Sequence, residues 1–250
     1  MKRAALPLLS LALGASLLSV LRASTTRAAA PLPVRYDATA AAAVARRFDT
    51  AYAVMPAPRE DKHGEILRRI RRAQEGTYIR DILLERDSAL VRWPDRHGRP
   101  LTVWIQPESQ VVDFTTSYAA VVRNAFEEWD GLHLPVQFSF VDDSADAEVH
   151  VTWIDRFNEP ISGRTRWSRD DSWLITEANI TLAVHHNSGD QLDDDAMRAM
   201  ALHEIGHLLG LDHTTDSMSI MAPRVRVREL SDADRATARL LYALPAGSLR

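Results

Sequence analysis

Eleven residues between His203 and His213 constrain the fold of this chain more than any other segment. His203 and His207 are four residues apart, so on a helix their imidazoles lie one turn apart on the same face. Gly210 tolerates positive φ and lets the chain leave the helix sharply, so that His213 can return toward the pair. The segment therefore predicts a helix, a tight turn and three imidazoles directed at one point.

Three neutral imidazoles suit a zinc ion and leave its fourth position open, as catalytic rather than structural zinc sites do. Glu204 follows the first histidine directly and would project beside the metal, where it can accept a proton from water that zinc activates. The alternative is a helix whose histidines only face solvent or core. That alternative leaves unexplained a pattern that fixes five positions in eleven residues.

Cysteine is absent from the chain, which restricts both its stability and its chemistry. No disulfide can stabilise the fold, and neither a thiolate zinc site nor a cysteine nucleophile is possible. Metal ligands must therefore come from His, Asp and Glu. The formal net charge of -4 and the lack of a polybasic tail indicate that nucleic acid is not a partner.

The first 30 residues have the pattern of an export signal. Lys2 and Arg3 give a positive start, residues 4–21 form an apolar run, and Ala28–Ala30 supply small residues suited to cleavage. We therefore expect a signal peptide over residues 1–30 and a secreted location, extracellular or periplasmic, with no stable membrane insertion after its removal. The alternative is an uncleaved N-terminal membrane anchor, since the run approaches the length that spans a bilayer.

The remaining hydrophobic pattern predicts an α+β domain with one sheet packed against helices. Strands are expected over residues 88–93, 101–105, 136–141, 148–154 and 179–184. Helices are expected over residues 117–129, 193–209 and 232–242, the last capped by Ser231.

Residues after the metal motif carry a resemblance to a known family. Ser219–Pro223 is similar to the methionine turn of the metzincin zinc proteases, with Met221 in the methionine's place; Met218 is the competing candidate. Further segments resemble the matrixin-like group of metzincins, which includes bacterial matrixins and matrix metalloproteinase catalytic domains. They are Leu101–Ile105, Ala125–Trp129, Asp146–Val151 and Leu230–Asp234.

The resemblance implies a metzincin-like fold: a mixed, mostly parallel sheet with an antiparallel edge strand, packed against an active-site helix and two further helices. It also implies a secreted zinc-dependent endopeptidase that acts on protein or peptide substrates. In this family the substrate lies along the edge strand, here about Gly163–Trp167. The substrate pocket would then involve Pro223, Val225 and Trp167, with Met221 as an apolar floor beneath the zinc.

Two alternative functions remain open at this stage. A protein of the same fold could hold zinc and grip a peptide without turnover, although such proteins commonly lose the base that Glu204 represents here. A structural or adapter role could use the basic stretch Arg68–Arg72, but it leaves the metal motif unexplained. The oligomeric state has no signature in the sequence.

The resemblance covers about residues 78–245, so we expect the catalytic domain to occupy residues 76–250. Residues 31–75 are rich in Ala and Arg and are interpreted as an N-terminal extension or a pro-region. Short helices are expected there over residues 38–52 and 65–74.

No second metal site is evident in the sequence. His185 and His186 end a strand, where neighbouring side chains point to opposite faces, so we expect them to be exposed and not to share a metal. Aspartates in two turns could bind calcium, but they lack the spacing of a known calcium loop, and calcium is not expected. They are Asp142, Asp143, Asp146, Asp170 and Asp171.

Overall fold

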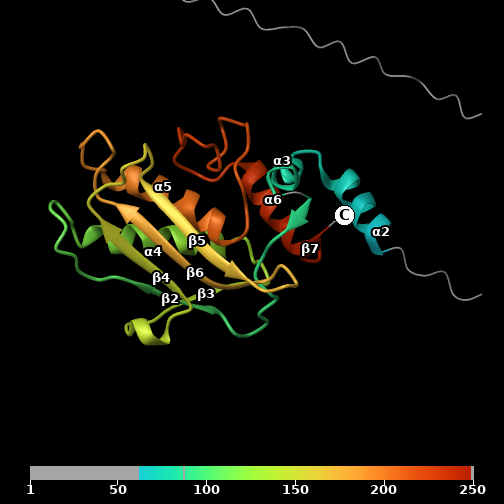
Figure 1. The fold of residues 1–250 in the computed structure, drawn as a ribbon, viewed down its shortest axis with the longest axis horizontal. Coiled ribbons are helices and arrows are strands. Elements are labelled where there is room, and N and C mark those ends of the chain that lie inside the picture. The colour runs from blue at the N-terminus through green and yellow to red at the C-terminus, as the bar shows by residue number, and fades with distance from the viewer. Residues whose placement is uncertain (1–61, 87, 249–250) are drawn as a thin grey trace, which may run out of the picture. The chain divides into compact units, whose positions relative to one another are not determined.

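A five-stranded sheet in the order β3-β2-β4-β6-β5 is the framework of the computed structural model (Figure 1), which describes residues 62–86 and 88–248. Its strands are β2 (Leu101–Ile105), β3 (Phe138–Phe140), β4 (Val149–Ile154), β5 (Gly163–Arg169) and β6 (Ile175–Ala183). A separate pair joins β1 (Ala89–Leu90) to β7 (Gly247–Ser248). The helices are α2 (Lys62–Ala73), α3 (Ile79–Glu85), α4 (Ser117–Asp130), α5 (Asp194–Leu208) and α6 (Asp232–Ala243), with a 3₁₀ turn at Ser144–Asp146.

Strand direction in this sheet leaves a distinctive edge. β3, β2, β4 and β6 run parallel, whereas β5 pairs antiparallel with β6, with Thr165 opposite Ile180. β5 is the last strand of the order, so one of its sides has no strand partner among the described residues. The expected mixed, mostly parallel sheet with an antiparallel edge strand is confirmed.

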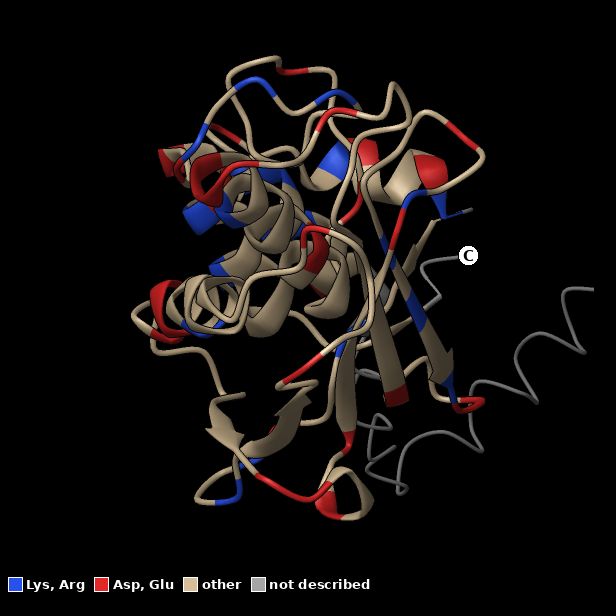
Figure 2. Ribbon diagram, turned by 90° about the vertical axis from the view of Figure 1, so that its left-hand side faces the viewer, with Lys and Arg blue, Asp and Glu red and all other residues tan. Residues whose placement is uncertain are grey.

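Helices α4 and α5 cover one face of the sheet (Figure 2). The alternation of β2 directs Leu101 and Val103 into this core, while α4 contributes Phe126 and Trp129. Burying a large apolar side chain of this kind stabilises the fold by roughly 1.5–3 kcal/mol. The indole Nε1 of Trp129 also donates to the carbonyl oxygen of Leu202 (3.0 Å), which fixes α4 against α5.

The segment expected as a strand over residues 88–93 differs from the expectation. Only Ala89 and Leu90 form a strand, and the backbone after them makes an isolated parallel bridge between Arg92 and Leu174. Trp93 Nε1 donates to the carbonyl oxygen of Leu208 (2.9 Å), and Arg92 Nε donates to that of Leu244 (3.0 Å). Residues 91–93 are therefore buried as a support for the ends of α5 and α6.

Helix α3 was not expected from the sequence. Ile79 and Ile82 are three residues apart and both fully buried, which is the spacing of one helix face. The fold thus adds α3 to the helices anticipated, whereas α2 matches the helix expected over residues 65–74 and contributes the buried Ile70 to the same core. The proposed signal peptide and the helix expected over 38–52 lie outside the described residues. Within the described part, no helix has the length and apolarity to cross a membrane.

Gly210 is expected to be the least replaceable glycine of the turn after α5. Its φ is +98°, and a Cβ there would lie 2.1 Å from the carbonyl oxygen of Val91. Gly210→Ala should therefore lower the free energy of unfolding by more than about 2 kcal/mol in urea denaturation of the zinc-free protein.

The matched control is Gly98→Ala, because Gly98 has a φ of +72° but no atom within 4 Å of the added Cβ. It should cost only about 1 kcal/mol, from the backbone conformation alone. Equal losses for the two variants would contradict the role given to the contact with Val91.

Candidate metal centre

Helix α5 and the turn after it place the three histidines. The Asp193 side chain caps the helix by accepting from Ala196 N (2.7 Å), with further carboxylates in the first turn that favour the helix dipole. At the other end, Leu211 N donates to the Gly206 carbonyl (2.9 Å), closing the turn through Gly210. His213 is thereby carried back beside the end of the helix.

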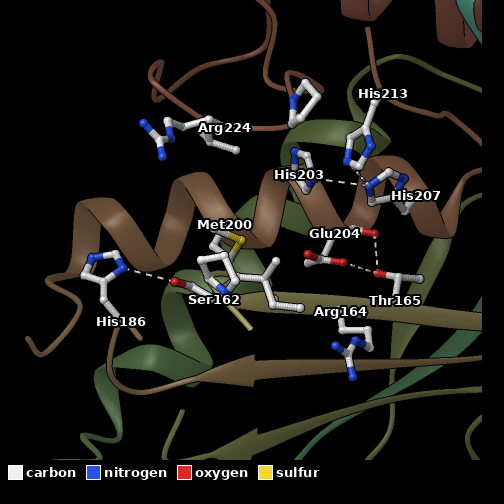
Figure 3. A pocket seen from close by; sticks show the side chains of 15 residues that line it. Ser162, Arg164, Thr165, His186, Met200, His203, Glu204, His207, His213 and Arg224 are labelled. Carbon is white, nitrogen blue, oxygen red and sulfur yellow. Dashed lines mark hydrogen bonds between the residues drawn. The ribbon is translucent and has the colours of Figure 1, made fainter. Parts of the chain in front are cut away.

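The three imidazoles converge at one point, as Figure 3 shows. His207 Nε2 lies 3.1 Å from His203 Nε2 and 3.3 Å from His213 Nε2. Nitrogen ligands of tetrahedral zinc, each about 2.0–2.1 Å from the ion, lie about 3.3–3.4 Å apart. The donor atoms therefore fit such an ion. Among residues 62–86 and 88–248, this is the single group of three His, Asp or Glu side chains so arranged.

Two of the imidazoles are oriented by backbone carbonyls. His203 Nδ1 lies 2.7 Å from the oxygen of Ile220, and His207 Nδ1 lies 3.1 Å from that of Leu211. A proton on each Nδ1 leaves the Nε2 lone pair directed at the common point. Burial lowers the pKa of His203 to about 4 and holds that of His207 well below its ordinary value. Both rings are therefore neutral near pH 7, the form that binds metals.

A buried carboxylate holds the segment below the histidines. Asp234, in the first turn of α6, accepts from Ser219 Oγ and from Ile220 N (3.1 Å), and so fixes the carbonyl that orients His203. Met221 is fully buried directly under α5: a Cβ on Gly206 would lie 2.3 Å from its sulfur. Met218, the competing candidate for the methionine turn, is 67% exposed.

Glu204 lies between α5 and the edge strand β5 and is almost fully buried. Thr165 Oγ1 lies 2.7 Å from Glu204 Oε2 and donates to it. Burial raises the pKa of Glu204 to about 7, while the Thr165 hydroxyl acts in the opposite direction. A Cβ on Gly163 would lie 2.5 Å from Glu204 Oε1, so only glycine leaves room for this carboxyl group.

Gly163 and Thr165 were not identified individually from the sequence, which gave only the strand that contains them. They are two residues apart, so both face α5. The available signal was a glycine within a strand, which often marks the close approach of another group.

A cavity of about 410 Å³ opens beside the histidines and Glu204. Its walls come from β5 and the segment before it, from α5, and from the loop after Met221. Besides the four residues of the centre, the lining includes Ile161, Ser162, Gly163, Thr165, His186, Met200, Pro223, Arg224 and Val225. Pro223 and Val225, which the family resemblance assigned to a substrate pocket, line this cavity. Trp167 is not part of this lining; its ring packs beneath the Arg86 guanidinium at 5.2 Å.

The expectation that His185 and His186 are exposed is wrong. His185 is buried, with Nε2 3.0 Å from Asp113 Oδ2 and Nδ1 2.8 Å from Asp155 Oδ1. His186 is half-buried in the cavity wall, with Nδ1 3.0 Å from Ser162 Oγ. These partners come from segments distant in sequence, which the periodicity of the strand does not reveal.

Comparison with known proteins places these features in context. A family model described as Matrixin matches residues 92–243, more than half of the chain. Metalloendoproteinase 2-MMP of Arabidopsis thaliana is 30% identical over 156 residues, covering 54% of this chain and 37% of the relative. Metalloendoproteinase 1-MMP of the same plant is 26% identical over 136 residues, covering 47% and 35%. Matrix metalloproteinase-C of Caenorhabditis elegans is 38% identical over 64 residues, covering 26% and 10%. The chain thus spans at most 37% of the length of each of these relatives.

The full-length chain is expected to bind one zinc ion, and His213→Ala should weaken that binding by at least about 100-fold. Losing a ligand removes more affinity than losing an outer partner, which typically costs 10–100-fold. Competition with a chelator of known affinity measures the effect. His97→Ala, at an exposed histidine, is the control and should bind zinc normally. Unchanged affinity of the His213 variant would exclude His213 as a ligand.

Proposed function

Because the chain belongs to the matrixin family, we propose that it is a zinc-dependent endopeptidase in which Glu204 is the general base. The observation that carries this proposal is the placement of a buried carboxylate beside three convergent imidazoles at one cavity. His203, His207 and His213 would hold the metal. Zinc, when bound, would supply a Lewis acid and make water a nucleophile near neutral pH.

The residues of the chain perform the proton transfers in this proposal. Glu204 takes a proton from the attacking water while the water oxygen forms a bond to the peptide carbonyl carbon. It then gives the proton to the amine nitrogen as the C–N bond breaks. Thr165 orients the carboxylate through its 2.7 Å contact with Oε2. Burial supports the role, because it raises the Glu204 pKa toward neutrality, where a carboxylate is a stronger base than an exposed one.

We further propose that an extended peptide pairs with the open side of β5. An edge strand offers a row of free backbone donors and acceptors, which a substrate can use regardless of its sequence. A side chain next to the cleaved bond would enter the cavity bounded by Pro223 and Val225. Trp167, farther along the same strand, would contact the peptide outside that cavity.

Glu204→Gln is expected to lower kcat for peptide hydrolysis by about 10²–10⁴-fold, because it removes the proton acceptor and keeps the shape. Zinc content should be unchanged. The assay is cleavage of a quenched-fluorescent peptide library by the full-length protein, with and without chelator. Glu177→Gln, at an exposed position of β6, is the control.

The outcomes separate the two functions considered. Turnover that survives in the Glu204 variant would refute the assigned base. Full zinc occupancy in the unchanged protein without cleavage of any library member would favour the alternative, a catalytically silent zinc protein that binds peptides.

We also propose that residues 1–30 direct export and that residues 31–75 form an extension or pro-region of the catalytic domain. When the full-length gene product is expressed in a secreting host, its exported form should begin near residue 31 in N-terminal sequencing. A product that stays in the membrane fraction and retains Met1 would instead indicate an N-terminal anchor.

A further inference from the structure

Helix α3 and Arg86, the residue after it, bind the turn that carries His213. Arg86 donates Nη1 to the Gly210 carbonyl (2.9 Å), Nη2 to the Leu211 carbonyl (3.0 Å) and Nε to Asp212 Oδ2 (2.7 Å). Its guanidinium and the Asp212 carboxylate are largely shielded from solvent, at 11% and 15% exposure. One planar cation therefore binds the last three residues before the ligand.

The residues after the ligand are bound by the same helix. Asp81 Oδ2 accepts from Thr214 Oγ1 (2.7 Å) and from Thr215 N (3.3 Å). His213 itself is exposed. Its Nδ1 contacts no carbonyl in the part of the chain that the structure describes, unlike the Nδ1 atoms of the other two ligands. The position of the third imidazole thus depends on the backbone on either side of it.

Helix α3 is itself firmly anchored, so it can serve as a fixed support. Tyr78, just before it, donates its backbone N–H to Thr237 Oγ1 (3.0 Å) and its hydroxyl to Asp234 Oδ1 (3.0 Å). Ile79 and Ile82 are fully buried. Asp234 is also the carboxylate that fixes the segment under His203. The hydrogen bonds of α3 therefore connect the supports of His203 and His213.

We propose that Asp81 and Arg86 are positioning residues that hold His213 at the metal centre before the metal binds. This inference rests on the proposed function, since it assigns roles toward the same metal. When the loop that carries a ligand is already ordered, metal binding does not have to order it, and no binding free energy is lost in doing so. The contacts of Asp81 and Arg86 therefore raise the metal affinity. Both residues precede residue 92, where the family match begins, so they supplement the matched region.

Arg86→Met in the full-length protein tests the inference, because methionine keeps an unbranched side chain and removes the donors. The zinc dissociation constant should rise about 10–100-fold, the range seen when a ligand loses its outer partner. At saturating zinc, kcat for peptide cleavage should return close to that of the unchanged protein. Arg86→Lys, which keeps the charge but not the planar fork, should recover part of the affinity. Arg80→Gln, at an exposed position of α3, is the matched control.

Asp81→Ala provides a second, separate test on the other side of His213, and remains informative where the Arg86 variant fails to fold. It too should weaken zinc binding, and its zinc-free melting temperature identifies any general loss of stability. Unchanged zinc affinity in folded Asp81→Ala, or a lower melting temperature with unchanged affinity in either variant, would overturn the inference. Failure of the unchanged protein to bind zinc would instead overturn the proposed function on which it rests.

Discussion

The site depends on keeping three imidazole nitrogens together, with His207 Nε2 3.1 Å from His203 Nε2 and 3.3 Å from His213 Nε2. Such a group gains nothing from its own contacts, because neutral rings with convergent lone pairs do not attract each other. The surrounding fold must therefore hold it. Helix α5 fixes His203 and His207, the turn at Gly210 returns the chain, and two carbonyl oxygens set the ring orientations. The position of each supporting group follows from this one requirement.

The carboxyl group of Glu204 imposes a second requirement, which the edge strand meets. A carboxylate buried at the helix–sheet boundary loses hydration, so its charged form needs a donor and room. Thr165 supplies the donor and Gly163 supplies the room, both on the face of β5 toward α5. The outer edge of the same strand has no strand partner among the residues that the structure describes. In the proposed function, one strand therefore positions the base and receives the peptide.

Features set by local chemistry could be predicted from the sequence. The spacing of His203 and His207 predicted α5, and Ser231 was expected as the cap of α6, where it forms a capping box with Asp234. The edge strand and the methionine turn followed only from the family resemblance. Features set by distant contacts could not be predicted. Arg86 and Asp212 are 126 residues apart in sequence, and neither residue type indicates the other.

The two clearest errors in the structure predicted from the sequence have the same physical origin. The apolar run ending at Trp93 is typical of a strand, yet after Leu90 its backbone makes an isolated bridge with Leu174, and the Trp93 indole packs against the end of α5. His185 was expected to be exposed because it lies at the end of a strand, yet Asp113 and Asp155, from other loops, lie beside its two ring nitrogens. Periodicity describes which face a side chain takes, but the tertiary fold decides what lies opposite that face.

The functional unit is consequently larger than the family match. Residues 92–243 contain the proposed metal ligands, the proposed base and the sheet, but two sets of contacts that support them begin outside. Upstream, α3 binds the backbone on both sides of His213. β1 then pairs with β7, joining Ala89 and Leu90 to residues beyond the other end of the match. Just after β1, Arg92 and Trp93 donate to carbonyl oxygens at the ends of α6 and α5. The turn that carries His213 is therefore supported by a segment that precedes the matched region, whereas Trp93, near the start of that region, supports the end of α5.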